Sequence, residues 1–148
     1  MHISENFLPY ESKTIILVCD RLHAKVYQAH DREFNFVEEI TDDRLPIGEA
    51  ERYTASGGGH QFTENDEGLK EREAHVFYAE LAKKLFEHKH KAGFEKLILV
   101  VPHEDKNVLI EALHDDVKRV LDRTIPKQLT KVGEDQVIEA IDAERRTV

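Results

Sequence analysis

The chain has 148 residues, enough for one domain with a core of its own, and 40% of them are hydrophobic. Acidic residues outnumber basic ones by 30 to 21, and the resulting net charge of −9 disfavours binding of duplex DNA through a broad basic face. Cys19 is the only cysteine, which excludes an intrachain disulfide, and no apolar run approaches the ~20 residues that span a bilayer. We therefore expect a cytoplasmic protein that does not enter membranes.

Three strands are predicted at the start of the chain. The first is a continuous apolar run rich in β-branched residues, typical of a strand covered on both faces. The second and third alternate, and the third is predicted to place Phe34, Phe36 and Glu38 on one face. Because the turns between the strands are short, we expect an antiparallel meander. The predicted strands are residues 14–19, 23–29 and 33–40.

A glycine-rich loop is predicted at residues 41–68, which hold five of the seven glycines and show no periodicity. Three consecutive glycines within it are followed by two polar residues. Glycine permits backbone conformations that other residues avoid and allows close approach to another molecule. The candidate binding residues are Gly57, Gly58, Gly59, His60 and Gln61. The alternative is a disordered loop without a function, because glycine-rich segments are often flexible linkers.

The second half of the chain alternates between helices and strands. Apolar residues spaced three and four apart predict a long helix at residues 69–91, with Tyr78 in its apolar stripe. Further predicted elements are a strand at 97–101, a helix capped by Asp105, a strand within 117–125 and a helix at 134–144.

The predicted fold is a single α/β domain over residues 1–148. Its elements follow the order β-β-β-α-β-α-β-α, and its mixed five-stranded sheet has a ribonuclease-H-like topology. Right-handed crossovers place the two most apolar strands, residues 14–19 and 97–101, side by side in the centre.

A second candidate site follows from this topology, since ligands of open α/β sheets bind beyond the carboxyl ends of central strands. The residues predicted in this crevice are Asp20, Arg21, His23, His103 and Glu104. Asp20 could hold Mg²⁺ in a nuclease, with a carboxylate from Glu73 or Glu80 on the long helix. The alternative interpretation, which we favour, makes Asp20 a turn residue and Asp105 a helix cap. Cys19 is predicted to be an inert core thiol.

Three segments also carry a family resemblance. They are Asp20 with the following AKVY of residues 24–27, the KERE of residues 70–73 with the apolar stripe after it, and FEKLILVVP at residues 94–102. Over roughly residues 13–143 the chain resembles the bacterial family of proteins required for attachment to host cells.

That family is in turn similar to the middle domain of archaeal and eukaryotic peptide-release factors. In those factors a Gly-Gly-Gln tip on a long helix enters the ribosomal peptidyl-transferase centre and promotes hydrolysis of peptidyl-tRNA. Here Gly58, Gly59 and Gln61 occupy the corresponding place, with His60 between the glycines and Gln61. The resemblance implies a release-factor middle-domain-like fold and a ribosome or tRNA partner.

Three functions therefore remain open at the level of the sequence. The first is a cytoplasmic interaction module whose glycine-rich tip contacts the ribosome or tRNA, without a cofactor or metal, and with binding favoured over catalysis. The second is a metal-dependent nuclease or phosphoesterase built around Asp20. The third is an adhesion-related regulatory protein without catalysis. The sequence leaves the oligomeric state open.

Overall fold

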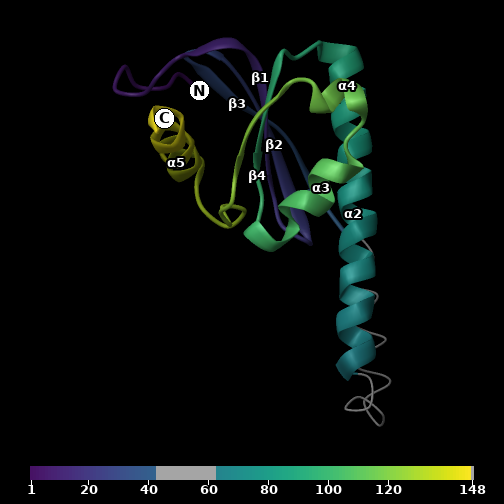
Figure 1. Cartoon of the computed structure of the whole chain (residues 1–148). Coiled ribbons are helices and arrows are strands. Elements are labelled where there is room, and N and C mark those ends of the chain that lie inside the picture. Colours follow the sequence, from purple (N-terminus) through teal and green to yellow (C-terminus); the bar gives the residue numbers. More distant parts are fainter. Residues whose placement is uncertain (43–62, 148) are drawn as a thin grey trace.

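The protein is seen in a computed structural model that describes residues 1–42 and 63–147, apart from the side chains of residues 63–71. Within these residues, three strands precede a long helix, and two further strands alternate with shorter helices (Figure 1). The elements are β1 (Tyr10–Cys19), β2 (His23–Asp31), β3 (Glu33–Thr41), α2 (Thr63–Ala92), β4 (Lys96–Val100), η2 (His103–Asp105), α3 (Lys106–Ala112), α4 (Asp115–Lys118), β5 (Leu121–Ile125) and α5 (Glu134–Arg146).

The strands form one mixed sheet in the order β3-β2-β1-β4-β5. The first three strands pair antiparallel, whereas β1–β4 and β4–β5 are parallel pairs. Asp31, the last residue of β2, adopts a positive φ of 53° at the turn into β3, the left-handed conformation that tight hairpins often need. The α/β class, the five-stranded mixed sheet and the central pairing of the two most apolar strands are confirmed.

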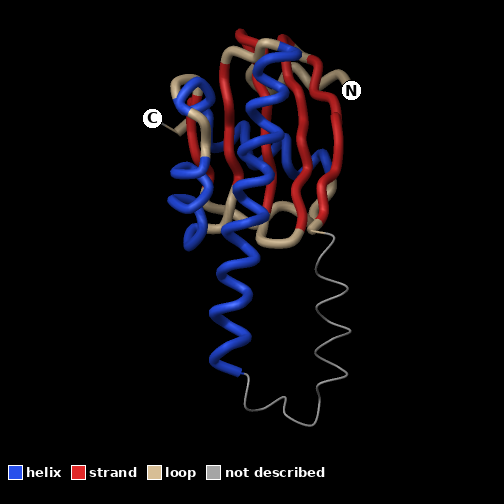
Figure 2. The backbone as a smooth tube through the Cα atoms, turned by 90° about the vertical axis from the view of Figure 1, so that its right-hand side faces the viewer, coloured by secondary structure: helices blue, strands red, loops and turns tan. Residues whose placement is uncertain are grey.

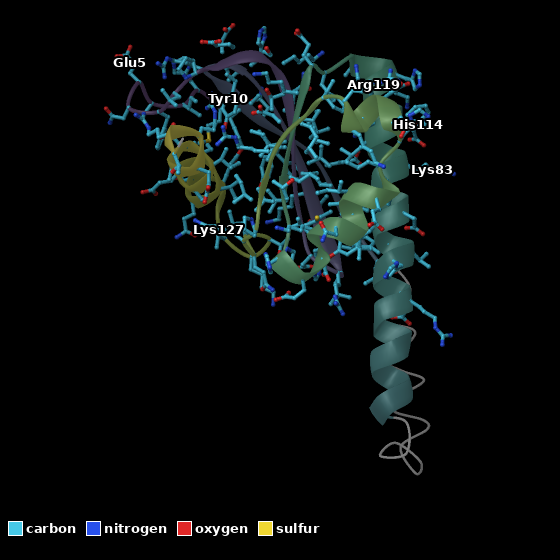
Figure 3. The ribbon with its side chains drawn as sticks, in the orientation of Figure 1. Glu5, Tyr10, Lys83, His114, Arg119 and Lys127 are labelled. Atoms are coloured by element: carbon cyan, nitrogen blue, oxygen red, sulfur yellow. The ribbon has the colours of Figure 1, made fainter. Side chains whose placement is uncertain are left out.

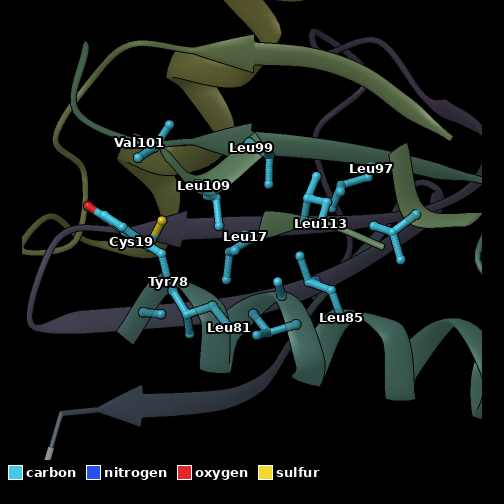
Figure 4. Close-up of a cluster of buried hydrophobic side chains, with 14 of the residues drawn as sticks. Leu17, Cys19, Tyr78, Leu81, Leu85, Leu97, Leu99, Val101, Leu109 and Leu113 are labelled. Carbon is cyan, nitrogen blue, oxygen red and sulfur yellow. The ribbon is translucent and has the colours of Figure 1, made fainter. Parts of the chain in front are cut away.

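Both faces of the sheet are covered by helices. Helices α2, α3 and α4 lie on one face and α5 on the other (Figure 1). In β1, Leu17 points into the α2-side cluster and Ile16 and Val18 into the α5-side cluster. Figure 4 shows the α2-side cluster, where leucines of the sheet meet Leu81 and Leu85 of α2. Because β1 is buried on both sides from Thr14 onward, its sequence from Ile15 to Cys19 is apolar throughout instead of alternating.

Helix α2 is longer than the sheet is tall and extends past one edge of it (Figure 2). Among the described side chains of α2, Ala74 is the first to be buried against the core. The backbone from Thr63 to Glu73 would span roughly 16 Å at 1.5 Å per residue. This edge holds the carboxyl ends of β1 and β4, because the turn after β1 and the turn after β4 meet there.

Several predicted boundaries differ from the structure. Helix α2 begins at Thr63 instead of residue 69, and β3 reaches Thr41, so both ends of the predicted loop at 41–68 belong to regular elements. Glu64, Asp66 and Glu67 favour a helix start here through the helix dipole, whereas the predicted range followed the apolar stripe, which begins later. Helix α4 takes the beginning of the segment 117–125, which leaves only Leu121–Ile125 for β5.

The predicted alternation in β3 is wrong beyond a bulge. Val26 of β2 pairs with Glu38, whereas the next residue, Tyr27, pairs with Phe36, so Val37 is an extra residue in β3. A bulge of this kind reverses the faces of the residues that follow it. Phe36 contacts the ring of Tyr27 edge-on, while Glu38 reaches α2 on the opposite face.

No helix within the described residues combines the length and the apolar character that crossing a bilayer requires.

Candidate functional site at the root of the long helix

Three side chains from three segments meet where α2 leaves the sheet. The Arg21 guanidinium donates two hydrogen bonds to Asp105, from Nε to Oδ2 and from Nη2 to Oδ1, each 3.0 Å long. The Tyr78 hydroxyl of α2 donates to Asp105 Oδ2 at 2.6 Å. Asp105 is 4% exposed and Tyr78 is fully buried. We call these three residues the helix-root network, because they tie α2 to the turns that follow β1 and β4.

The charges in the helix-root network stabilise one another. Burial alone would raise the pKa of Asp105, but the hydrogen bonds from Arg21 and Tyr78 and the positive charge of Arg21 outweigh it and lower this pKa. Burial and the hydrogen bond to Asp105 both raise the pKa of Tyr78 above its ordinary value. At neutral pH the network therefore consists of a carboxylate, a guanidinium and a neutral phenol, which fixes the direction of each hydrogen bond.

A second set of bonds holds the turn beside this network. Asp20 Oδ1 accepts hydrogen bonds from the backbone nitrogens of Leu22 and His23, both at 2.8 Å. Asp20 Oδ2 accepts one from the Thr130 hydroxyl at 2.6 Å, which links the end of β1 to the segment between β5 and α5. The preferred interpretation of Asp20 as a turn residue is thereby supported.

The structure brings only part of the predicted crevice together. Asp20 and Arg21 lie at the carboxyl edge of the sheet, and His23 Nδ1 is 3.6 Å from Asp20 Oδ1. His103 and Glu104 sit on η2 with exposed side chains, and no bond joins them to the other three in the described part of the chain. We therefore describe this edge as a closed polar network instead of an open crevice.

The predicted role of Asp105 as a helix cap is wrong. Asp105 occupies the N-cap position of α3, but its side chain makes no capping hydrogen bond. Its two carboxylate oxygens already accept three hydrogen bonds from Arg21 and Tyr78, and those bonds span distant parts of the sequence. A charged bidentate pair binds more strongly than a backbone amide, so the tertiary contact replaces the local one.

The described residues offer no ligand set for a metal ion. No group of three or more His, Cys, Asp or Glu side chains among them is arranged to hold one. Both oxygens of Asp20 are engaged in the turn and with Thr130. Cys19 is fully buried beside this edge, and burial first, then the negative charges of Asp20 and Asp105, raise its pKa. Its thiol therefore stays protonated, in agreement with a core role.

Two contributors to this region were missed at the level of the sequence. Tyr78 was assigned to the apolar stripe, and its ring does pack there, but its hydroxyl completes the network. A tyrosine in an otherwise apolar stripe was the available signal, since a buried hydroxyl needs a partner. Thr130 carried no signal, because its partner Asp20 lies on a distant segment of the chain.

The candidate tip residues lie outside the described residues. They are Gly57, Gly58, Gly59, His60 and Gln61. In the sequence only Phe62 separates them from Thr63, where the projecting end of α2 begins.

The architecture is that of a release-factor-like α/β domain. The chain is similar to a crystal structure of the archaeal translation termination factor aRF1, with a TM-score of 0.52 and 15% sequence identity. The match covers 90% of this chain and 39% of the archaeal chain, so the protein spans about two fifths of the length of that factor. At this identity the similarity establishes the fold alone.

The sequence itself defines the family. The model of bacterial archaeo-eukaryotic release factor family 12 matches residues 13–141, and the chain belongs to that family. No protein with a curated description matches it. The release-factor part of the sequence resemblance is thereby confirmed, whereas the host-attachment part finds no support in these matches.

Proposed function

We propose that the protein is a translation-associated interaction module that contacts the ribosome or a bound tRNA through residues 57–61, which precede the projecting end of α2 in the sequence. Membership of a release-factor family supports a ribosomal partner. The observation that carries the proposal is the 30-residue helix, which extends past the sheet and directly follows the glycine-rich sequence. In this role the protein acts in the cytoplasm, where ribosomes are, and neither duplex DNA nor a membrane is its partner.

The helix-root network can hold the base of α2 in one orientation, which a contact at the far end of the helix requires. A long helix can position a distant contact only if its base does not tilt. Apolar packing of α2 on the sheet is not directional, so it does not by itself select one orientation of the helix. The hydrogen bonds from Tyr78 and Arg21 to Asp105 are directional and select one orientation of α2 relative to the sheet. We infer that this network orients the projecting end of α2 relative to the sheet.

We propose binding instead of hydrolysis as the activity of the tip. In this sequence His60 separates Gly59 from Gln61, so the spacing differs from the Gly-Gly-Gln sequence of the factors that the chain resembles. Misplacing a catalytic group by about 1 Å can cost about 100-fold in rate. Contact with RNA or with a tRNA end tolerates such a shift, because stacking and hydrogen bonding can adapt.

The other two functions receive less support. A nuclease or phosphoesterase at Asp20 needs carboxylate oxygens that are free to bind a metal ion, and those of Asp20 accept bonds from protein groups. Neither the family match nor the fold bears on attachment to host cells, so that adhesion-related function stays a prediction from resemblance.

Co-sedimentation with purified 70S ribosomes tests the proposal. The variants are Gln61→Ala and the double variant Gly58→Ala with Gly59→Ala. Both are expected to weaken ribosome binding by about tenfold, the equivalent of ~1.4 kcal/mol. The matched control is Gly133→Ala, at the start of α5, where an added Cβ meets nothing within 4 Å. Ribosome binding that survives both tip variants would remove residues 57–61 from the proposal, and absence of binding by the wild type would refute it.

A peptidyl-tRNA hydrolysis assay with the same proteins separates binding from catalysis. We expect ribosome binding without release of the peptide. Release that depends on Gln61 would show that the tip is catalytic despite the altered spacing.

A further inference from the structure

A pocket opens on the face of the sheet opposite α2, at the amino ends of β1, β4 and β5. Its volume is about 280 Å³, and we call it the α5-side pocket. Its floor is formed by residues that neighbour each other across the parallel strands: Thr14 pairs with Lys96, and Ile98 pairs with Arg123. Its walls are the end of α5 and the segment that leads into β1, near Tyr10 in Figure 3.

Three cationic side chains from three different elements line this pocket. Lys96 comes from β4, Arg123 from β5 and Arg145 from α5. Two carboxylates, those of Glu11 and Asp122, also line it, so the positive charges exceed the negative ones. In a protein with a net charge of −9 such a local excess is unusual and favours an anionic ligand.

Arg145 is a fixed part of the wall. Its Nη1 donates to the carbonyl oxygen of Leu8 at 3.0 Å, and its Nη2 donates to that of Pro9 at 2.5 Å. The guanidinium also lies over the ring of Tyr10, with its carbon 3.9 Å from the ring centroid. Neutral carbonyls do not cancel the charge of Arg145, so it contributes positive potential while it shapes the pocket.

The other two cations are poorly satisfied by the protein. Arg123 Nη1 donates to the Glu144 carbonyl oxygen at 2.5 Å, but its buried Nε has no hydrogen-bond partner. The carboxylate of Asp122 is 3.7 Å from that Nε, too far for a hydrogen bond. In the described part of the chain no carboxylate lies within ion-pair distance of the Lys96 ammonium, and its side chain is exposed. Buried polar atoms normally have partners, so the unpartnered Nε of Arg123 indicates that the described protein groups leave this guanidinium incompletely satisfied.

We propose that the α5-side pocket binds the phosphate group of a small hydroxylated phosphomonoester. A phosphate accepts charge-assisted hydrogen bonds from Lys96 and from the guanidinium of Arg123. Ser12 and the two carboxylates are then available for hydroxyl groups of the same ligand. A volume of about 280 Å³ lies at the small end of ligand pockets, which suits a compact metabolite better than a nucleotide. This site is formed by other residues than the proposed tip and lies on the face of the sheet opposite α2.

Titrations of the ¹⁵N-labelled full chain, followed by NMR at constant ionic strength, test the proposal. The probes are glycerol 3-phosphate, inorganic phosphate and glycerol. Glycerol 3-phosphate is expected to give saturable shifts at the amides of Thr14, Lys96 and Arg123. Inorganic phosphate should shift the same amides more weakly, and glycerol should shift none of them. Comparable binding of glycerol 3-phosphate and inorganic phosphate would identify free phosphate as the ligand. It would overturn the proposal that the ligand is a hydroxylated phosphomonoester.

Matched lysine variants show whether the pocket itself binds the anion. Lys96→Gln is expected to raise the Kd for glycerol 3-phosphate about tenfold, which corresponds to the loss of one charge-assisted hydrogen bond. Lys118→Gln, on an exposed residue of α4 across the sheet, should leave it unchanged. Because Lys96 is exposed, its replacement is not expected to unfold the protein. Shifts that do not saturate, or that both variants weaken equally, would refute the site.

Discussion

The parallel strands end at a carboxyl edge and begin at an amino edge, and these two edges of the sheet differ in how completely their charged side chains are paired. At the carboxyl edge, Asp105 accepts three hydrogen bonds, and the oxygens of Asp20 are also occupied. At the amino edge, the buried Nε of Arg123 has no hydrogen-bond partner, and Asp122 lies 3.7 Å from it. A fully paired edge resists deformation and suits a mechanical role, whereas an incompletely paired edge can still bind a ligand.

The largest expected difference between the edges concerns stability. Asp105→Ala should lower the free energy of unfolding by about 3 kcal/mol, because it leaves the buried Tyr78 hydroxyl without an acceptor and removes the partner of Arg21. The matched substitution Asp122→Ala at the amino edge should cost less than about 0.5 kcal/mol, because its 3.7 Å contact with Arg123 is long and both side chains are partly exposed. Urea denaturation measures both. Equal losses would show that the two edges do not differ in this way.

The acid dependence of stability provides a second test of the same edge. The pKa of Asp105 is lower in the folded protein than its ordinary value of 3.8. Its charge therefore contributes stability that is fully present above pH 3.8 and is lost as the pH falls through the lowered pKa of the folded state. In Asp105→Asn the free energy of unfolding should fall less steeply below pH 3.8 than in the wild type. Parallel curves from urea melts at successive pH values would contradict this assignment.

Removal of a single hydroxyl from the network should have a smaller effect. Tyr78→Phe keeps the ring in the α2-side cluster and deletes only the bond to Asp105, so we expect a loss of about 1 kcal/mol. Tyr27→Phe is the matched control, because Tyr27 is also buried and no hydrogen bond of its hydroxyl is seen in the described residues. Hydrogen exchange should accelerate selectively in the first turns of α2 in Tyr78→Phe, if the network orients that helix. Uniform acceleration would limit Tyr78 to general stability.

The sequence predicted the layers well because each layer has its own pattern. A continuous apolar strand needs cover on both faces, and an apolar stripe with a spacing of three and four needs one covered side. Together with the right-handed crossover of parallel strands, these two rules placed β1 beside β4 and α2 upon them. They also placed the apolar ring of Tyr78, but they carry no information about the direction of its hydroxyl.

The two polar edges could not be predicted because their residues are distant in the sequence. Asp105 has the local pattern of a helix cap, and only the folded chain shows that Arg21 competes for it. The α5-side pocket assembles Lys96, Arg123 and Arg145 from three elements, and each of them alone looks like a surface residue. Hydrophobic periodicity reports which face is buried, whereas polar contacts of this kind depend on how the elements meet.

The bulge in β3 is a third feature that could not be predicted from the sequence. One extra residue in the strand reverses the alternation of faces on which the prediction was based. Alternation placed Glu38 on the face of Phe34, but Val37 interrupts the pairing with β2. Glu38 therefore faces α2, where its Oε2 lies 2.7 Å from His88 Nε2 and its Oε1 lies 3.9 Å from Lys84 Nζ. No residue type in this stretch signals the insertion, since Val37 is itself a typical strand residue.

The smallest predicted effect tests this bulge directly. Glu38 and His88 are partly exposed, so their pair should contribute only about 0.5 kcal/mol. A double-mutant cycle with Glu38→Gln and His88→Gln, measured by urea denaturation near pH 6, should give a coupling energy of that size. The neighbouring pair Glu39→Gln with His88→Gln should give none, because Glu39 lies on the other side of the strand backbone. If Glu39 couples to His88 and Glu38 does not, β3 pairs without the bulge, and the edge strand follows the simple alternation after all.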